Sequence, residues 1–313
     1  MNIDLTRLRY LVAAVEHGNI KKAAETQHIT QSALTRSIQK LERDLGAKLL
    51  ERQSRGVVAT PIGKRLCEHA KRIVNVADAA FSDIEELVSG SDSPLRLGIC
   101  PTLLSNSVLA GLMRVYESHT PRELYVVEAF HNTLIQLLRL GELDLVLTSL
   151  PEEKVMPGVI VQELRNLTIE RSIFAYSGHE LFSKANISQS DIQNARWVFS
   201  NQAYYIRGME SYFDLRKIPR PKVSLKTDSL AVLRHAIVAQ SHVALLSSHL
   251  VARHFREGSV RALPGTSQTN QISHALLWSR DTVLSPAAQN VVEKVRLIYN
   301  DDTFNPDDTD LLY

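Results

Sequence analysis

The chain of 313 residues is poor in the features that mark secreted, membrane-bound and redox-active proteins. Its two cysteines, Cys67 and Cys100, form no Cys-x-x-Cys pair, so we expect reduced thiols rather than a disulfide framework, with a redox switch between them as the less favoured alternative. No apolar run approaches the ~20 residues needed to span a bilayer. The N-terminal sequence MNIDLTRLRY lacks an apolar stretch behind a basic start, which predicts no secretory signal, no membrane partner and a cytoplasmic location.

Sequence motifs of common enzymes are absent as well. The chain has neither a Walker loop nor a Gly-x-Ser-x-Gly turn. Four histidines lie in one stretch, but their spacings of seven, seven and five match no metal-binding motif: His235, His242, His249 and His254. We therefore expect no catalytic residue, no metal site and no bound cofactor.

Charge is unevenly distributed along an otherwise ordinary globular composition of 44% hydrophobic and 22% charged residues. Residues 1–72 carry a net charge of +7, from 14 basic and 7 acidic side chains, whereas the remainder carries −5. A basic end attached to a mildly acidic body is typical of a polyanion-binding module joined to a second domain. The length agrees with two domains, or three if one of them is split.

Residues 19–45 carry the most informative pattern. Ala23 and Ala24 lie in a short helix that Asn19 caps, and Thr30 caps a second helix that ends before Gly46. Four apolar residues of this second helix recur at spacings of four, three and four and share one face: Leu34, Ile38, Leu41 and Leu45. The opposite face presents hydrogen-bonding side chains: Gln31, Ser32, Thr35, Arg36, Gln39 and Arg43. A buried back and a polar front suit a helix that reads DNA, and an amphipathic helix over residues 5–17 precedes the pair.

Residues 50–59 are predicted to form a small hairpin. Its strands would be 50–53 and 57–59, on either side of Ser54-Arg55-Gly56. Arg52 and Arg55 would then project toward phosphates or a minor groove. A solvated loop is the alternative, and the neighbouring helix pair favours the hairpin.

A long helix is expected over residues 61–89, because Thr60 offers a capping hydroxyl and Pro61 suits the first helical position. Seven apolar positions alternate spacings of four and three along it: Leu66, Ala70, Ile73, Ala77, Ala80, Ile84 and Leu87. Such a heptad seam is typical of a helix that packs along its length against a partner. We interpret it as a dimerisation helix, with packing on its own domain as the alternative. GSDSP at residues 90–94 is expected to be a hinge.

Beyond the hinge, short apolar strands alternate with helices, which predicts parallel strands covered by helices on their faces. Strands are expected at 95–100, 124–128, 143–149, 171–176, 197–200, 223–226, 243–246 and 272–278, and helices at 101–119, 132–140 and 285–300. The two similar halves suggest two α/β lobes with a cleft between them, where ligands bind beyond the carboxyl ends of strands. The acidic end, 301–313, is predicted to be disordered.

The N-terminal residues resemble the winged helix-turn-helix of LysR-type transcriptional regulators. The matching positions are Ala23-Ala24, Gln31 to Arg36, Leu41-Glu42, Leu45-Gly46, Leu49 to Arg52, and Thr60-Pro61-x-Gly63. Leu50 departs from the family, which often has Phe there, and we expect only local repacking. Further along, Leu95 to Gly98 with Pro101-Thr102, and Gly141 to Asp144, resemble the family's effector domain, which is similar to periplasmic binding proteins.

The resemblance implies a plan for the whole chain. An N-terminal all-α winged helix-turn-helix (residues 1–60) would be followed by the linker helix (61–89), the hinge (90–94) and a C-terminal α/β two-lobed effector domain (95–300). Lobe I would comprise about 95–161 and 268–300, and lobe II about 162–267. The resemblance also implies a regulator that binds a double-stranded DNA operator and assembles as a dimer of dimers (a homotetramer), with RNA polymerase as a candidate partner. A periplasmic solute-binding protein is less favoured, because it should carry an export signal and no basic helix-turn-helix.

The predicted DNA contacts follow by analogy with other helix-turn-helix proteins, whose recognition helix enters the major groove with its N-terminal residues. They are Gln31, Ser32, Thr35, Arg36, Gln39, Arg52 and Arg55. Arg36 is the best candidate for reading a base, because a guanidinium can pair with guanine through two hydrogen bonds. The alternative for Arg36 is a contact with phosphate only.

The resemblance places a small effector between the lobes, at five positions: Thr102, Ser149, Ser200, Asn201 and Thr227. Hydroxyls and amides beside helix N-termini suit a small organic anion, so we expect a carboxylate or sulfonate. Phe130, Tyr204 and Tyr205 are candidates to flank an aromatic ring. The alternative is that most of these residues are caps and core, since Thr227 precedes a helix and would cap it in any case.

Overall fold

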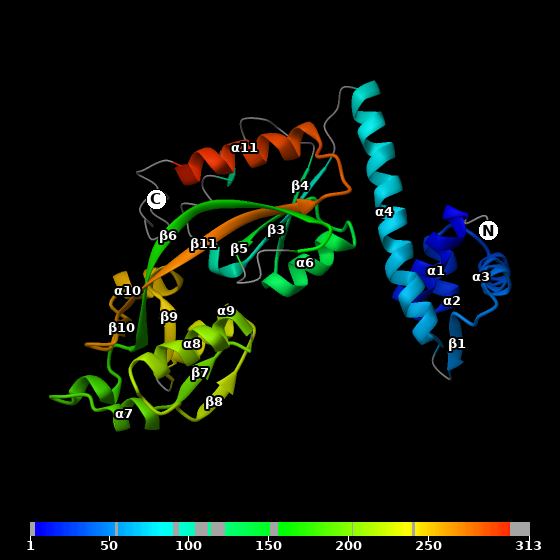
Figure 1. Ribbon diagram of the computed structural model, residues 1–313. Helices are drawn as coiled ribbons and strands as arrows, with labels where there is room; N and C mark the ends of the chain where they lie inside the picture. Colours follow the sequence, from blue (N-terminus) through cyan, green and yellow to red (C-terminus); the bar gives the residue numbers. More distant parts are fainter. Residues whose placement is uncertain are drawn as a thin grey trace.

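In the computed structural model, the described residues are 4–53, 56–89, 94–103, 112–113, 123–150, 156–201, 203–239 and 242–300. They form a helical N-terminal part and a larger α/β part, with the long helix α4 (Pro61–Ser89) between them (Figure 1). Most of the predicted hinge, most of the helix predicted after Pro101, and the predicted tail at 301–313 lie outside the described residues. Among the helices of this described part, none is long and apolar enough to cross a membrane.

The N-terminal part contains the expected helices and hairpin. Their bounds are α1 (Leu5–His17), α2 (Ile20–Thr26), α3 (Gln31–Leu45), β1 (Leu50–Gln53) and β2 (Gly56–Ala59). The side chain of Asn19 accepts hydrogen bonds from two backbone N–H groups of α2, and that of Thr30 accepts one from the third residue of α3. Gly18 and Gly46 end α1 and α3 in the left-handed conformation, with φ of 57° and 65°. The local signals thus define each helix end.

Small residues let the helices of this part approach each other closely. The alanines of α1 and α2 pack against the apolar face of α3: Ala13, Ala14, Ala23, Ala24, Leu34 and Ile38. The hairpin closes on the turn between α1 and α2, because the N–H of Val57 donates to the carbonyl of Gly18 at 2.9 Å. A Cβ on Gly56 would lie 2.1 Å from that carbonyl oxygen, so this approach requires glycine.

Helix α4 begins at a tight junction with β1. The Thr60 hydroxyl donates to the carbonyl of Lys48 at 2.7 Å and accepts from the N–H of Gly63 at 2.9 Å. The first half of α4 then packs on α1, where Ala70 is fully buried beside Leu8.

The predicted seam is therefore not one continuous free face. Leu66 and Ala70 lie against the protein's own N-terminal core, whereas Ile73 and Ile84 are exposed. The prediction that the seam packs on a partner along its whole length is wrong for Leu66 and Ala70, because these residues already pack on the N-terminal core. In the second half, the large apolar side chains that the structure describes are exposed.

The α/β part contains a mixed sheet of seven described strands, in the order β10-β6-β11-β5-β3-β4 with β9 paired to β6. Their bounds are β3 (Leu95–Ile99), β4 (Leu124–Glu128), β5 (Leu145–Ser149), β6 (Val159–Tyr176), β9 (Ala244–Ser247), β10 (Val260–Ala262) and β11 (Gln268–Ser279). A separate two-stranded sheet consists of β7 (Trp197–Phe199) and β8 (Val223–Lys226).

Only some of these strands are parallel. Strands β4, β3 and β5 are parallel to one another, and β7 is parallel to β8. In contrast, β11 runs antiparallel to β5 and β6, and β9 and β10 run antiparallel to β6. The prediction of a parallel arrangement is wrong for these strands. The chain crosses between the lobes on β6 and returns on β11, so the two strands run in opposite directions.

Strands β6 and β11 are much longer than the predicted segments 171–176 and 272–278. They pair from Val159 opposite Ser279 to Arg171 opposite Gln268. Polar residues interrupt the apolar pattern of β6 near its middle, in the run Glu163-Leu164-Arg165-Asn166, so the pattern marks only its ends. Each long strand continues from lobe I into lobe II (Figure 1).

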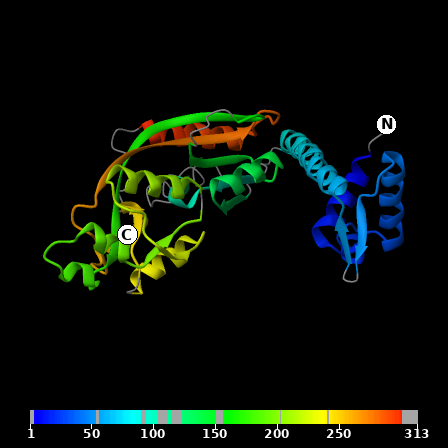
Figure 2. The ribbon, with the colours of Figure 1, turned by 60° about the horizontal axis from the view of Figure 1, so that its bottom comes forward.

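Helices cover both lobes. Lobe I has η1 (Pro101–Leu103), α6 (His131–Arg139) and α11 (Pro286–Asn300), and α6 and α11 lie on opposite faces of its sheet (Figures 1 and 2). Lobe II has η2 (Glu180–Ser183), α7 (Gln189–Asn194), α8 (Ala203–Leu215), α9 (Leu230–Val238), η3 (Ser248–Val251) and α10 (Ala252–Arg256). A large apolar cluster fills lobe I, and two smaller clusters, around Trp197 and Phe174, fill lobe II.

Candidate functional site

Helix α3 lies beside the hairpin at the outer side of the N-terminal part (Figure 2), and its polar face is exposed to solvent. Four of its predicted DNA-contacting side chains are exposed: Gln31, Ser32, Arg36 and Gln39. Three of the four predicted core residues are buried on the other side: Leu34, Ile38 and Leu41. The first turns of α3 therefore offer hydrogen-bonding side chains together with the positive end of the helix dipole.

Two residues of α3 differ from the prediction. Thr35 is only half exposed, and its hydroxyl donates to the carbonyl of Gln31 at 2.8 Å. Leu45 was expected in the core, but its exposed fraction is 36%. The prediction for Leu45 is wrong because the last turn of α3 ends in the Gly46 turn and faces solvent.

Glu42 connects α3 to the hairpin. Its buried carboxylate accepts hydrogen bonds from the N–H of Leu49 at 2.9 Å, the N–H of Leu50 at 3.4 Å and the amine of Lys48 at 3.0 Å. Burial raises the pKa of Glu42, but these hydrogen bonds outweigh it and hold the pKa below its ordinary value. The carboxylate thus fixes the start of β1 relative to α3. Periodicity assigns this residue no role, since a glutamate on the core face breaks the apolar pattern.

The basic side chains around α3 include some that the sequence analysis did not single out. Arg52 is exposed on β1, whereas Arg55 lies outside the described residues. Lys21 and Lys22 begin α2 and Lys40 lies on α3, and all three are exposed. The adjacent lysines at 21–22 were the signal available for this basic surface.

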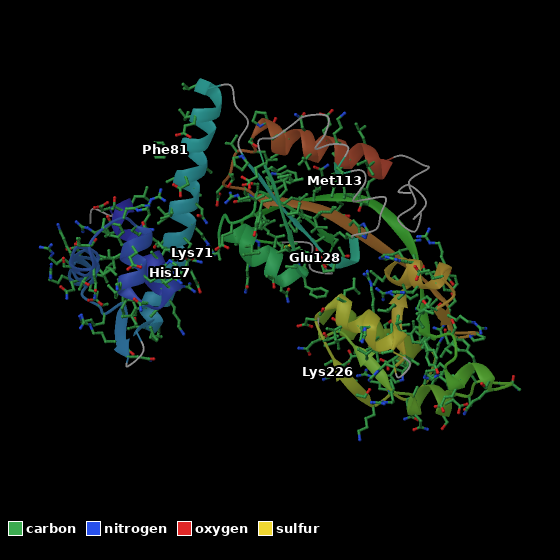
Figure 3. The ribbon with its side chains drawn as sticks, turned by 180° about the vertical axis from the view of Figure 1, so that it is seen from behind. His17, Lys71, Phe81, Met113, Glu128 and Lys226 are labelled. Carbon is green, nitrogen blue, oxygen red and sulfur yellow. The ribbon has the colours of Figure 1, made fainter. Side chains whose placement is uncertain are left out.

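The second half of α4 exposes apolar side chains on a helix surface. Phe81, Ile84 and Val88 have exposed fractions of 68%, 58% and 83%. Phe81 points away from the α/β part (Figure 3). Large exposed apolar residues clustered on one helix are typical of an interface. The heptad count had selected Ile84 but missed Phe81 and Val88.

A pocket lies between the lobes, at the ends of parallel strands. It is lined by Pro101 and Phe130 from lobe I and by Ser200, Thr227 and Leu246, among others, from lobe II. It encloses about 290 Å³, counting space open to solvent. Pro101, Phe130, Ser200 and Thr227 each follow the carboxyl end of a parallel strand within three residues. The fold therefore brings three predicted residues, Phe130, Ser200 and Thr227, into one cavity.

Some residues around this pocket form hydrogen bonds that stabilise the local backbone. The Thr227 hydroxyl accepts from the N–H of Ser229 at 3.1 Å, and the Ser229 hydroxyl accepts from the N–H of Val232 at 3.3 Å and caps α9. The N–H of Asn201 donates to the carboxylate of Asp228 at 3.1 Å. Ser229 rather than Thr227 therefore caps α9, while Thr227 stabilises the turn before the cap and borders the cavity.

None of the described contacts places the other predicted effector residues at the pocket. Ser149 ends β5 and lies opposite His274 of β11 in the sheet. The side chains of Thr102, Tyr204 and Tyr205 lie outside the described residues.

Charged groups from both lobes face each other near the pocket. Glu128, at the end of β4, points toward lobe II (Figure 3). Arg234 of α9 donates from Nε to the carbonyl of Leu250 at 2.8 Å. Burial lowers the pKa of Arg234, and the attraction of Glu128 opposes that shift. Glu128 of lobe I and Arg234 of lobe II therefore attract each other.

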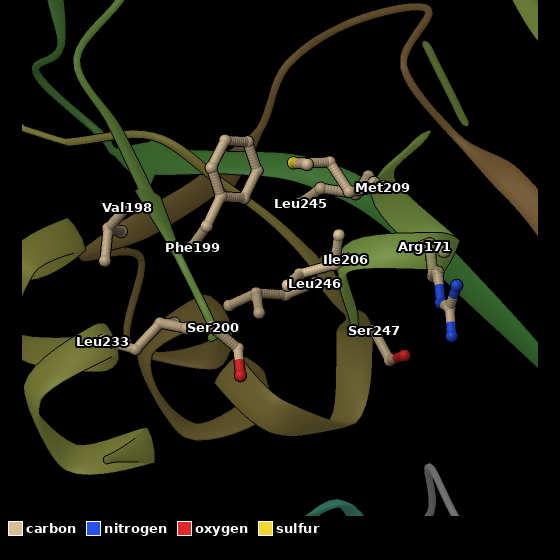
Figure 4. Close-up of a pocket in the computed structure, with 11 residues that line it drawn as sticks. Arg171, Val198, Phe199, Ser200, Ile206, Met209, Leu233, Leu245, Leu246 and Ser247 are labelled. Atoms are coloured by element: carbon tan, nitrogen blue, oxygen red, sulfur yellow. The ribbon is translucent and has the colours of Figure 1, made fainter. Parts of the chain in front are cut away.

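A second pocket extends into lobe II and shares Ser200, Leu233 and Leu246 with the first (Figure 4). It encloses about 470 Å³, counting space open to solvent, and most of its lining is apolar. Arg171 of β6 and Ser247 of β9 border it. Arg171 was not among the residues predicted from the sequence to bind an effector.

Three of the described histidines are buried, namely His179, His242 and His274, and so are both thiols. Cys67 and Cys100 are both buried, and burial raises the pKa of the Cys67 thiol. His274 and Tyr299 form a buried pair in lobe I, with His274 Nδ1 2.8 Å from the Tyr299 hydroxyl. Within the described residues, no cluster of His, Cys, Asp and Glu could hold a metal ion.

Two known families match this chain. Residues 5–64 match the bacterial regulatory helix-turn-helix protein family of the lysR type, and residues 89–297 match the LysR substrate binding domain. A hydrogen peroxide-inducible genes activator of Pectobacterium carotovorum is 26% identical over 94% of this chain and 96% of its own length. An SDS degradation transcriptional activation protein of a Pseudomonas species is 29% identical over 91% of this chain and 93% of its own. These relatives are regulators of transcription.

Solved structures share the fold along nearly the whole chain. A full-length OxyR variant of Pseudomonas aeruginosa superposes with a TM-score of 0.66 and 24% identity, covering 95% of this chain and 96% of the other. CbnR, a LysR family transcriptional regulator, superposes with a TM-score of 0.67 and 17% identity over 96% of this chain and all (100%) of its own. CbnR in complex with its target DNA gives a TM-score of 0.65 and 17% identity over 94% and 99%.

Proposed function

Because the chain belongs to the LysR family of transcriptional regulators, with a DNA-binding and an effector-binding domain, we propose a role for each of its parts. Helix α3 reads an operator in the major groove, and the hairpin holds the adjacent backbone. The exposed half of α4 pairs with a second copy of the chain. A small organic anion between the lobes controls the regulator.

The exposed polar face of α3 carries the DNA-reading part of this proposal. Its first turns combine Gln31, Ser32 and Arg36 with a helix N-terminus, and Glu42 holds the hairpin beside them. Arg36 donates from Nε to the carbonyl of Ser32 at 3.3 Å, so its side chain follows the helix toward the N-terminus. The edge of a guanidinium there can form two hydrogen bonds with guanine. Arg52, Lys21 and Lys22 supply charge for phosphates.

Removing the guanidinium of Arg36 tests the assignment. We expect Arg36→Ala to weaken binding to the operator by ~1–3 kcal/mol and to flatten the preference at one base pair, because the lost contact discriminates between bases. The measurement is a fluorescence-anisotropy titration of the full chain against the operator and its single-base variants. Equal weakening on all sequences would make Arg36 a phosphate contact and overturn the base-reading role.

A matched arginine far from the helix-turn-helix serves as the control. Arg139, exposed at the end of α6 in lobe I, is replaced by alanine in the same titration. Arg139→Ala should leave both operator affinity and base preference unchanged. Arg52→Ala should weaken all sequences alike and reduce the salt dependence, because phosphate contacts release counterions.

The exposed apolar residues Phe81, Ile84 and Val88 support self-association through α4. A two-fold dimer would present two copies of α3 to a symmetric operator. CbnR bound to its target DNA is a solved example of the fold on DNA. For this chain, pairing through the second half of α4 leaves the first half on α1, and assembly of two such dimers into a tetramer follows the family plan.

The pocket between the lobes supports control by a small molecule, at Ser200, Thr227 and the adjacent Asn201. The peroxide response named for some relatives does not extend to this chain in our proposal. Cys67 lies in α4 beside the N-terminal core and Cys100 ends β3 in lobe I, and both are buried. Buried thiols in separate elements are poorly placed to form a reversible disulfide.

A further inference from the structure

The lobe II pocket has a polar mouth and an apolar interior. Phe199 and Met209 lie on one side of it, while the hydroxyl of Ser200, the hydroxyl of Ser247 and the guanidinium of Arg171 lie toward the other (Figure 4). Leu245 and Leu246 complete the apolar wall. A ligand that fits this arrangement has an apolar body and a polar end.

The β-sheet places Arg171 and Ser247 side by side. They are direct partners in the antiparallel pairing of β6 with β9. Residues directly opposite each other in such a pair project from the same face of the sheet, with their Cβ atoms about 5 Å apart. A guanidinium and a hydroxyl from neighbouring strands thus converge at the pocket mouth.

Gly208 makes room for the guanidinium. It lies inside helix α8, where glycine costs about 1 kcal/mol relative to alanine. A Cβ at this position would lie 2.6 Å from Nη1 of Arg171. The helix therefore has its least bulky residue where the arginine side chain passes.

The described charged residues of the two connected pockets differ in sign. Among the described lining residues, Arg171 is the charged one of the lobe II pocket and Asp228 that of the pocket between the lobes. The carboxylate of Asp228 repels an anion at Thr227, and the guanidinium of Arg171 attracts one. The negative group of an effector is therefore better placed at Arg171 than beside Thr227.

We propose that Arg171 binds the negative group of the effector and that the lobe II pocket holds its apolar body. This inference rests on the proposed control by a small organic anion and narrows it to amphipathic acids, with one aromatic ring or a short alkyl chain. Arg171 is then the residue that selects acids over neutral analogues, since a guanidinium pairs with a carboxylate through two charge-assisted hydrogen bonds.

Two matched pairs of probes test this inference: benzoate with benzyl alcohol, and hexanoate with 1-hexanol. Binding of each to the full-length chain is measured by isothermal titration calorimetry near neutral pH. We expect at least one acid to bind at least about tenfold more tightly than its alcohol, because the charged hydrogen bonds are lost in the alcohol. In Arg171→Gln this preference should fall to about twofold or less.

Two further variants separate selection from folding. Arg261→Gln removes an exposed arginine of lobe II that stacks on Phe182, and it should keep the acid preference of the unchanged protein. Arg171→Lys keeps the positive charge without the planar guanidinium and should keep an intermediate preference. If Arg171→Gln does not fold, the acid preference of Arg171→Lys is compared with that of the unchanged protein instead.

The outcomes distinguish this inference from the function on which it rests. If neither acid binds the unchanged chain at millimolar concentration, control by a small organic anion of this class fails together with the role of Arg171. If an acid binds and Arg171→Gln or Arg171→Lys keeps the full acid preference, the role of Arg171 is overturned and effector control stands. Operator binding without ligand should be the same in Arg261→Gln as in the unchanged protein.

Discussion

The N-terminal part is stabilised by contacts between residues close in sequence, whereas the effector domain is stabilised by contacts between residues far apart in sequence. In the N-terminal part, Glu42 binds the N–H of Leu49, and Thr60 binds the carbonyl of Lys48. In the effector domain the main ladder joins Val159 to Ser279 on β6 and β11. The first part is therefore assembled from neighbouring segments, and the second forms only when distant segments meet. The two parts should respond separately to substitutions and to pH.

Both tryptophans of the chain, Trp197 and Trp278, lie in the effector domain. Tryptophan fluorescence thus reports the unfolding of that domain, while operator binding reports the N-terminal part. The following three changes use these two signals, and the expected loss of stability decreases from the first to the third.

Gly63→Ala should unfold the N-terminal part and spare the effector domain. A Cβ at Gly63 would lie 2.0 Å from the carbonyl oxygen of Leu49, which is a clash with backbone that no rotamer can relieve. We expect a loss of about 3 kcal/mol or more in the stability of this part. Operator binding should disappear, and the urea transition followed by tryptophan fluorescence should stay unchanged.

Gly46→Ala is the matched control for that change. A Cβ at Gly46 meets nothing within 4 Å, so only its φ of 65° disfavours alanine. This variant should cost about 1 kcal/mol and keep operator binding. An equal loss in both glycine variants, or a shift of the tryptophan transition by Gly63→Ala, would show that the two parts do not unfold independently.

Mild acid should weaken the effector domain more than the N-terminal part. Burial, and secondarily the nearby His249, lower the pKa of His274 to about 3, against an ordinary 6.5. Between these values the unfolded chain binds a proton that the folded chain does not, so stability falls as the pH falls. From about pH 7 to about pH 5 we expect a loss of about 2 kcal/mol in urea unfolding followed by tryptophan fluorescence.

The pH response can be assigned by substitution. His274→Gln removes the titrating group and should remove this part of the slope, whereas His235→Gln, at an exposed histidine of α9, should leave the slope unchanged. In the N-terminal part, the pKa of Glu42 lies below its ordinary 4.5, so its contribution is lost only at still lower pH. A pH slope in His274→Gln as steep as that of the unchanged protein would contradict the assignment, since His131, His179 and His242, whose pKa values burial also lowers, account only for the remainder.

Lys71→Met should have the smallest effect, because it removes a half-exposed ionic link between the two parts. The amine of Lys71 lies 2.6 Å from the carboxylate of Glu16 in α1 and 3.2 Å from that of Glu142 after α6 (Figure 3). Burial lowers the pKa of Lys71, but hydrogen bonds and attraction from both carboxylates outweigh it and raise the pKa. Solvent screens such exposed pairs, so the expected loss is about 1 kcal/mol or less in urea unfolding.

Salt and a neighbouring lysine provide the controls for Lys71. The effect should vanish near 1 M salt, where charges are screened within about 3 Å. Lys64→Met, at an exposed position of the same helix, should change nothing at either ionic strength. A loss that persists at high salt would show that Lys71 acts through packing rather than charge.

Local chemistry made the N-terminal part predictable. Asn19, Thr30 and Gly46 set the helix ends through their own side chains or conformational freedom, without help from distant residues. Leu45 shows the limit of this reasoning, because a periodic position at a helix end has no neighbour to cover it. Glu42 shows another limit, since its partners Leu49 and Leu50 are recognisable only once the chain has turned back.

The candidate effector site was predictable only in part. Ser200 and Thr227 follow apolar strands, and ends of parallel strands gather at one edge, so their proximity to the pocket could be expected. Arg171 lies inside a strand longer than its apolar pattern indicates. Its position at a pocket depends on pairing with β9 and on the space beside Gly208.

The sequence by itself determined the helices, the caps, the basic end and the polar face of α3, because each depends on contacts within a few residues. Only the tertiary structure decided that α1 covers the start of the α4 seam, that β6 and β11 run antiparallel through both lobes, and that Arg171 and Ser247 share a pocket mouth. These features join residues far apart in the chain, and their pairing depends on the packing of the whole domain rather than on any local pattern.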